Sequence, residues 1–195
     1  MFGMNVIIFL SVISLAGCAM TDLNKTVRED TISAEKYNES GNNYFSKGQY
    51  DLAMLEYKKA IEIFPQYAKA HSNLGYAHFE KKQYDHAIAE FTKAIDIDAL
   101  YAKAYNNRGL VYFARGEYDR AIHDYNRAIE IDPDLAKPYD NRGAIYMLTG
   151  DTEKACSDFV RACKLGECST YDMLMEEGLC DLDYLATADI QESEG

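Results

Sequence analysis

Small and apolar residues recur along this chain with a period of 34 residues. At this spacing a glycine, an alanine, an aromatic residue, a second alanine and a β-branched residue follow one another in fixed order. The rows are Gly41, Gly75, Gly109 and Gly143; Ala53, Ala87, Ala121 and Ala155; Tyr57, Phe91, Tyr125 and Phe159; Ala60, Ala94, Ala128 and Ala162; and Ile61, Ile95 and Ile129, with Cys163 in the last place. A fixed period of this length is the signature of a repeat architecture.

Each period predicts two helices. In residues 102–135, Tyr105 and Gly109 are four residues apart and share one face of a first helix. The alanine and aromatic rows define a second helix, which Pro133 ends because proline cannot continue a helix. Gly116 lies in the turn between them. One such hairpin cannot bury its apolar face alone, so neighbouring copies must stack into an all-α solenoid.

The order of these residues resembles the tetratricopeptide repeat, in which an aromatic residue, Leu-Gly, Tyr, Ala, Phe or Tyr, Ala and Pro recur at this period. The resemblance covers residues 34–67, 68–101, 102–135 and 136–169, and it implies a right-handed α-solenoid of four helix-turn-helix units. The sequence departs from the pattern where leucine is usual, where proline closes a unit and in one turn. These departures are Ser40, Arg108 and Arg142; Ala99 and Glu167; and Lys82. None of them touches the glycine and alanine rows.

The first 17 residues have the features of a secretory signal. They carry no charged side chain, and their apolar run, residues 6–15, is shorter than the roughly 20 residues of a spanning helix. The tetrapeptide Leu15-Ala16-Gly17-Cys18 resembles the bacterial lipobox, which implies removal of residues 1–17 and acylation of Cys18. An uncleaved leader, or a buried first helix with a chance cysteine, is the alternative.

A lipidated Cys18 would anchor the protein stably, because the resemblance implies three fatty chains and two suffice. Ala19 follows the cysteine, where enterobacterial sorting would require aspartate for inner-membrane retention, so we expect the outer membrane, with the protein facing the periplasm. Residues 19–33 lack an apolar period and are expected to form a polar tether. Its reach of up to about 50 Å would let the solenoid hang away from the lipid.

The other four cysteines cluster at the last unit and its extension, an even number that suits an oxidising compartment. Cys156 and Cys163 are seven residues apart on one helix, about 10.5 Å along its axis, which is too far for a disulfide. The best full pairing joins Cys156 to Cys180 and Cys163 to Cys168. We therefore expect a capping helix at 170–188 and a polar tail at 189–195. Free buried thiols are an alternative, whereas zinc is disfavoured because paired CxxC units are missing.

Composition and motifs exclude several classes of function. A formal charge of -12 and a pI near 4.7 argue against a nucleic-acid partner, which requires a basic face. His71 and His78 stand in rows that hold tyrosine in other units, so they are interpreted as packing residues and no metal site is expected. The sequence has no phosphate-binding glycine loop, nucleophile elbow or HExxH. We expect neither an enzyme nor a cofactor.

The resemblance implies a concave groove lined by the first helices, where a ligand would bind. The expected groove residues are Lys69, Lys103 and Lys137; Asn73, Asn107 and Asn141; and an apolar ladder of Phe45, Phe79, Phe113 and Met147. Asparagine can donate to and accept from a peptide backbone, and lysine attracts an acidic segment or a terminal carboxylate. The set partly resembles the two-carboxylate clamp of chaperone-binding members. It differs where that clamp needs lysine, at Asn38, Ser72, Asn106 and Asp140.

Two functional hypotheses follow from the sequence. The favoured one is an outer-membrane lipoprotein that acts as an adaptor, binding an extended segment of an envelope protein in its groove. The alternative is a fixed structural subunit of a pilus, secretion or outer-membrane assembly that uses its convex or terminal surfaces. The groove residues could also be common consensus residues whose lysines pair with neighbouring acids and carry little specificity.

Overall fold

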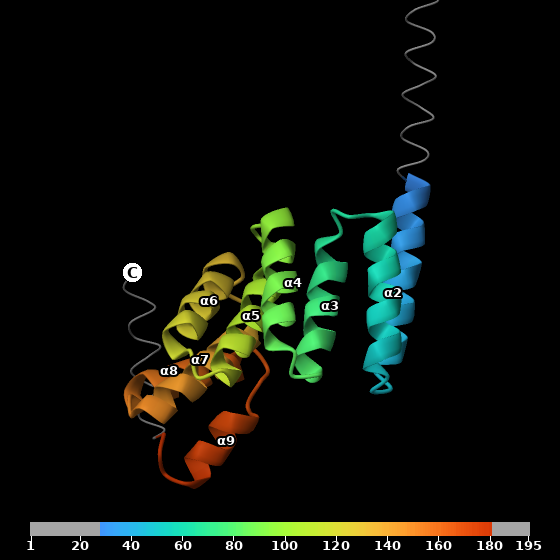
Figure 1. Ribbon diagram of the computed structural model, residues 1–195. Helices are drawn as coiled ribbons and strands as arrows, with labels where there is room; N and C mark the ends of the chain where they lie inside the picture. Colours follow the sequence, from blue (N-terminus) through green and yellow to red (C-terminus); the bar gives the residue numbers. More distant parts are fainter. Residues whose placement is uncertain (1–27, 181–195) are drawn as a thin grey trace, which may run out of the picture.

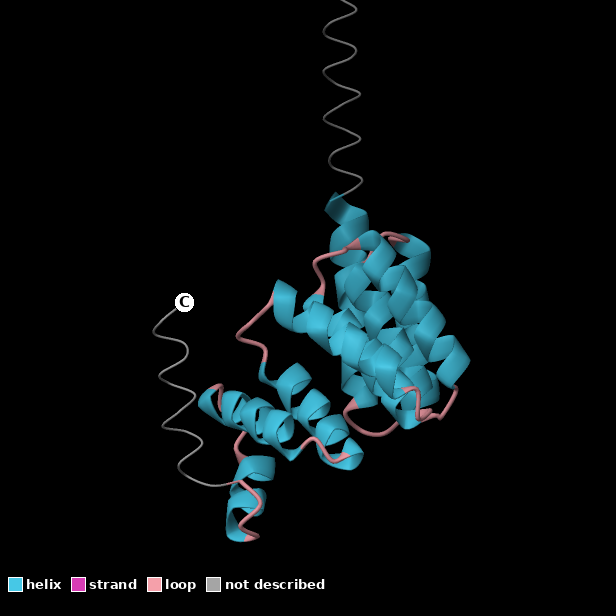
Figure 2. Ribbon diagram, turned by 90° about the vertical axis from the view of Figure 1, so that its left-hand side faces the viewer, coloured by secondary structure: helices cyan, strands magenta, loops and turns pink. Residues whose placement is uncertain are grey.

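The computed structural model describes residues 28–180 (Figure 1). The predicted signal 1–17, the lipidation site Cys18 and the tail 189–195 lie outside the described residues. So do most of the expected tether and residues 181–188 of the expected capping helix. Within the described part, every regular element is a helix, and Figure 2 shows helices joined by short loops. The all-α prediction is confirmed.

The helices follow one another in pairs along a curved array (Figure 1). An N-terminal helix, described over residues 28–45, pairs with α2, and the remaining pairs follow in chain order. Each of the four expected units contains one such pair. The bounds are α2 Tyr50–Ile63, α3 Ala68–Glu80, α4 Tyr84–Ile97, α5 Ala102–Ala114, α6 Tyr118–Ile131, α7 Ala136–Thr149, α8 Thr152–Lys164 and α9 Ser169–Glu176.

Two boundaries differ from expectation. Residues 28–33, expected in the polar tether, are helical and continue into the helix that buries Ala34. Extending an existing helix adds hydrogen bonds without a new nucleation cost, so a polar stretch can join it. At the other end, α9 closes at Glu176 instead of running to 188. Gly178 follows with φ +69°, a left-handed conformation that ends helices and that glycine adopts without strain.

The glycine and alanine rows bring the two helices of each unit into close contact. A Cβ placed on Gly109 would lie 2.7 Å from the Tyr125 ring of the partner helix, closer than real contacts allow. Ala121 and Tyr125 are fully buried beside it. The small residues that recur with the repeat period therefore lie at the contact between the two helices of each unit.

The turn of the second unit contains a lysine in a glycine conformation. Lys82 has φ +58°, close to the φ of +74° at Gly116 in the next unit. Its backbone N–H donates to the Phe79 carbonyl at 2.7 Å, as Gly116 does to Phe113 at 2.9 Å. The turn geometry is thus preserved at the cost of strain, because a side chain disfavours this region of φ.

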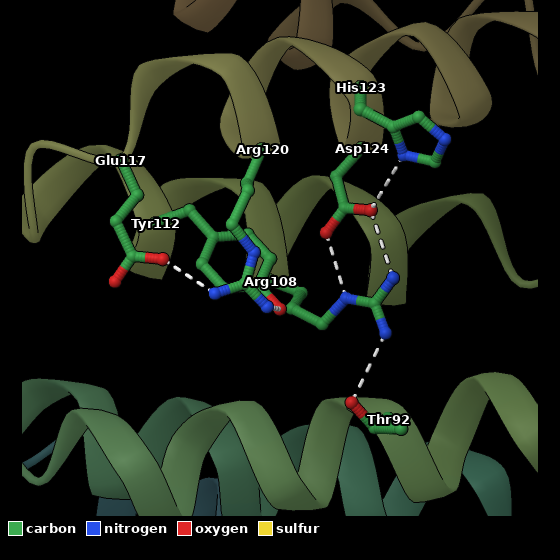
Figure 3. A network of polar contacts seen from close by, with 7 residues as sticks. All are labelled: Thr92, Arg108, Tyr112, Glu117, Arg120, His123 and Asp124. Carbon is green, nitrogen blue, oxygen red and sulfur yellow. Dashed lines mark hydrogen bonds and ion pairs between the residues drawn. The ribbon is translucent and has the colours of Figure 1, made fainter.

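Two departures from the family pattern form buried ion pairs between helices, and Figure 3 shows the pair of Arg108. Arg108 on α5 donates twice to Asp124 on α6, at 2.8 and 2.9 Å, and once to Thr92 on α4, at 3.1 Å. Arg142 repeats the arrangement one unit later, with Asp158 at 2.7 and 2.8 Å. Each arginine also joins its own unit to the second helix of the unit before, Arg108 through Thr92 and Arg142 through Asn126.

The C-terminal cysteines attach α9 to the last unit. Disulfides join Cys156 to Cys180, with Cα atoms 5.6 Å apart, and Cys163 to Cys168, with Cα atoms 4.0 Å apart. These are the two pairs that the spacing favours. Cys156 and Cys180 are buried with Tyr171 of α9, so this helix covers the apolar end of the array. No helix within residues 28–180 combines the length and apolar character needed to cross a membrane.

Candidate functional site

The first helices of the units form the inner side of the array. α3 contacts α5, and α5 contacts α7, whereas the second helices contact mainly the first helices beside them. Helices on the inside of a curved stack lie closer together than those outside, so α3, α5 and α7 line its concave face. Nine of the ten expected groove residues lie on these three helices, and Phe45 lies on the N-terminal helix.

The asparagines of the groove bond to one another in short chains. Asn73 on α3 donates from Nδ2 to Oδ1 of Asn38 at 2.8 Å and of Asn42 at 3.2 Å, both on the N-terminal helix. Asn141 on α7 donates to Asn106 on α5 at 3.0 Å. These bonds link neighbouring units and hold the amides in place. The asparagines are therefore a positioned polar surface, and part of their hydrogen-bonding capacity is already used.

The asparagine chain is interrupted between the second and third units, where Ser72 takes the place of an asparagine. Asn107 accepts from Asn106 at 3.2 Å, and its own Nδ2 has no partner among residues 28–180. Asn107 is half-buried and faces this interruption from α5. Its free amide hydrogens are the donors best suited to a ligand carbonyl.

The three lysines of the row differ in their ion pairs. Lys69 and Lys103 have no acidic partner within the described residues, whereas Lys137 has one. Lys69 and Lys103 are exposed and line a cavity of about 510 Å³ together with Asp132 and with apolar residues of α5 and α6 and the turn between α4 and α5. The apolar part comprises Leu100, Tyr101, Ala102 and Ile131. No acidic side chain in the described ranges pairs with either lysine. Lys137, by contrast, forms an ion pair with Glu167 at 2.9 Å.

Aromatic rings line the other edge of the inner face. Phe45 stacks on Tyr76, with ring centroids 5.3 Å apart, and Tyr76 stacks on Phe79 at 6.0 Å. Burial raises the pKa of the Tyr76 hydroxyl, and the charge of Lys137, two units further along, acts on it in the opposite direction.

The aromatic edge extends beyond the residues that the sequence singled out. Phe79 packs near Tyr84 at 6.0 Å, and Phe113 near Tyr118 at 5.9 Å. Sequence reasoning missed these tyrosines and Tyr76, although Tyr84 and Tyr118 are 34 residues apart and Tyr50 precedes them at the same spacing. The last member of the expected ladder, Met147, is partly buried and packs against the cluster that includes Tyr171 and Leu174 of α9.

The inner face therefore carries three parallel rows: lysines at one edge, asparagines in the middle and half-exposed aromatic rings at the other edge. Such a surface can bind a chain segment by charge, backbone hydrogen bonds and apolar contact together. Across the described part of the chain, no three His, Cys, Asp or Glu side chains gather in a way that could hold a metal ion.

Comparisons with known proteins agree with this architecture. The family model described as tetratricopeptide repeat matches residues 102–135, a second model of that description matches 136–165, and a model described as TPR repeat matches 41–82 and 75–114. No curated protein matches the chain.

Solved structures with the same fold include MamA, at 30% identity over 76% of this chain and 86% of MamA, with a TM-score of 0.61. The first TPR of Spaghetti (RPAP3), bound to the HSP90 peptide SRMEEVD, is 28% identical over 62% of this chain and 95% of that chain, with a TM-score of 0.58. PilF of Pseudomonas aeruginosa, at 23% identity, covers 76% of this chain and 71% of its own with a TM-score of 0.68. The likeness to PilF shows a shared fold.

Proposed function

Because the chain belongs to the tetratricopeptide repeat family, we propose that it is a lipid-anchored scaffold of the bacterial envelope that binds an extended segment of a partner protein. The observation that carries this proposal is the juxtaposition of three chemically different rows on the inner face of α3, α5 and α7. Repeat scaffolds present such continuous concave surfaces to their partners. The fold alone would name only a mode of binding.

The order of the rows indicates the chemistry of the segment. Successive side chains of an extended peptide point to opposite sides. A segment that alternates acidic and apolar residues would direct its carboxylates to Lys69 and Lys103 and its apolar side chains to the ring pair of Tyr76 and Phe79. Its backbone would then lie over the asparagines, where Asn107 can donate to a carbonyl.

The acidic part of the ligand belongs over the second and third units. In the fourth unit Lys137 is already paired with Glu167, and Asp140 stands in the groove position where a clamp would have lysine. Additional carboxylates there would meet like charge, which is unfavourable. The RPAP3 domain, which has a related sequence, was solved with an acidic peptide, and this supports the same class of ligand here.

The anchoring part of the proposal rests on the N-terminal sequence. The run 6–15 and the tetrapeptide ending at Cys18 have the form of a lipoprotein signal, and Ala19 suits the outer membrane. The two C-terminal disulfides support an oxidising compartment such as the periplasm.

The proposal is tested by capture from detergent-solubilised envelopes with the native protein as bait, beside a Lys103→Glu variant. Lys103 is exposed and unpaired in the described structure, so its reversal changes the charge of the groove without breaking a contact. Lys58→Glu is the matched control, because Lys58 is an exposed lysine of α2, outside the groove. We expect a partner that the parent and the control retain and the Lys103 variant loses.

Binding of a synthetic peptide with alternating glutamate and leucine, followed by fluorescence anisotropy, gives the same comparison with a defined ligand. Its affinity should fall in the Lys103 variant and with rising salt. Equal capture and equal affinity for all three baits would refute groove binding and favour the alternative of a structural subunit that uses outer or terminal surfaces. Intact mass of the bait tests the anchor separately, since an unprocessed Met1 start would overturn it.

A further inference from the structure

The N-terminal end of the array exposes large apolar side chains. Ile32 and Tyr37 on the N-terminal helix are 44% and 36% exposed, and Leu52 and Leu55 on α2 are 44% and 50% exposed. Ile32 is four residues before Lys36, and Leu52 is four before Glu56, so each pair shares a helix face. Lys36, Tyr37 and Glu56 line one cavity, which joins the two faces into a single surface. This surface is called the end face below.

The leucines of the end face are peculiar to the first unit. The positions equivalent to Leu52 hold a histidine or a cation, and those equivalent to Leu55 hold only small or polar residues. The residues equivalent to Leu52 are His86, Arg120 and Lys154, and those equivalent to Leu55 are Ala89, His123 and Ser157. At these two positions the other three units therefore carry no large apolar side chain. Two leucines at this end alone indicate a local contact that the other units do not make.

One site on the end face is open, whereas the equivalent site of a later unit is covered by a helix. In the third unit, the second helix of the preceding unit covers the place of Arg108 and bonds to it through Thr92. The equivalent residue of the first unit, Ser40, lines a cavity of about 360 Å³ with Ser33, Lys36, Tyr37 and Glu56. Lys59 lies over the Tyr37 ring at 5.5 Å, so a cation and an aromatic ring stand together at its rim.

The order of the chain connects the end face to the proposed anchor through a short segment. Because the described helix is already formed at residue 28, at most residues 19–27 separate Cys18 from it as a connector. Nine residues span about 30 Å when fully extended, which is shorter than the reach of about 50 Å expected for a tether over 19–33. The N-terminal helix, with which the described part of the chain begins, and α2 form one end of the array (Figure 1).

We propose that the end face rests on the lipid surface and holds the array upright with its groove facing the periplasm, an inference that rests on the proposed acylation of Cys18. Leucine and isoleucine side chains enter the boundary between headgroups and acyl chains. Tyrosine lies at the interface, with its ring in the apolar layer and its hydroxyl in water. Lys36 can extend its ammonium group to the phosphates, whereas Lys59 is held in an ion pair with Glu56 at 2.7 Å. The acyl chains on Cys18 would hold the protein at the membrane, and the end face would set the orientation of the array on it.

Single tryptophan reporters test this contact, since the chain contains no tryptophan. Leu55→Trp reports on the end face. Leu148→Trp is the matched control, because Leu148 is 64% exposed on α7, in the last unit. The acylated full-length product of each variant is reconstituted into vesicles of phosphatidylethanolamine and phosphatidylglycerol, with and without brominated acyl chains. We expect a blue shift and loss of emission with brominated lipid at position 55, and neither at position 148.

The outcomes separate this inference from the anchor on which it rests. If intact mass shows acyl chains and the two reporters behave alike, the end-face contact is wrong and the anchor stands. If the protein carries no acyl chains and does not sediment with vesicles, both the anchor and the end-face contact are wrong. Shielding of the reporter at position 55 from acrylamide without vesicles, rising with protein concentration, would mean that a second copy covers the end face and would refute lipid contact.

A second reporter guards against a local effect of the substitution at Leu55. Ile32→Trp on the same face should also be quenched by brominated lipid, and the added pair Leu52→Glu and Leu55→Glu should abolish that quenching. Circular dichroism confirms that the variant remains helical. Undiminished quenching at position 32 in the charged variant would contradict the proposed orientation.

Discussion

The buried pair of Arg108 and Asp124 allows a quantitative test of how this array is held together. The side chains are 16% and 2% exposed, and the arginine reaches both carboxylate oxygens and Thr92 (Figure 3). Arg108→Leu restores the residue that the second unit has at this position, Leu74, and leaves Asp124 buried. The imidazole of His123 would remain beside it, with Nδ1 3.6 Å from the carboxylate on the exposed side.

The expected loss follows from the contacts. Two hydrogen bonds between charged groups contribute about 1.5–3 kcal/mol each, and burying the new leucine returns about 1.5–3 kcal/mol. The buried carboxylate without a partner adds a desolvation penalty, and removal of one partner from such a pair costs about 3–5 kcal/mol. We therefore expect Arg108→Leu to lower the free energy of unfolding by about 3 kcal/mol.

The double variant Arg108→Leu, Asp124→Leu separates a charge effect from a packing effect. Apolar replacement of both partners is close to neutral in buried pairs, so we expect it within about 1 kcal/mol of the parent. Arg127→Leu is the control, because its pair with Glu130 is 41% and 59% exposed, and such pairs contribute about 0–1 kcal/mol. Urea unfolding followed by circular dichroism, on the full chain with Cys18→Ser, measures all three. Additive losses in the double variant would refute this account.

Three further predictions concern the turn, a buried histidine and the capping helix. Lys82→Gly should raise the free energy of unfolding by about 1 kcal/mol in the same assay, because glycine adopts the positive φ without strain; an unchanged value would argue against strain. Burial lowers the pKa of His78 below its ordinary value of about 6.5, so its contribution to stability is present above that pH and is lost as pH falls through the lowered pKa. His78→Tyr should flatten this part of the stability curve in urea titrations between neutral and acidic pH, and an equal slope in both proteins would contradict it. Replacing Cys156 and Cys180 by serine opens a loop of 24 residues and should cost about 3.5 kcal/mol, with early protease cleavage near α9 in limited proteolysis, whereas unchanged cleavage would show that packing alone holds the helix.

Much of the candidate groove follows from the period, because residues 34 apart must occupy equivalent places in a stack. Lys103 and Asn107 could therefore be assigned to the first helix of the third unit from sequence alone. Whether either side chain is free to bind a ligand could not be predicted from the sequence. The pairing of Lys137 with Glu167 and the bond between Asn141 and Asn106 depend on contacts across the stack, and the sequence contains no local signal for such contacts.

The sequence by itself determined the architecture of this protein. The rows of small residues that include Gly109 and Ala121 mark where the two helices of a unit must approach closely. This close approach fixes how the two helices pack. Only the tertiary structure decided what the exceptions mean. Arg108 looked like a departure from the pattern and proved to be half of a buried pair, and the exposure of Leu55 became visible only when the end of the array was known. Packing within a unit is local in sequence, whereas ion pairs between helices and exposure at an end depend on which helices the stack brings together.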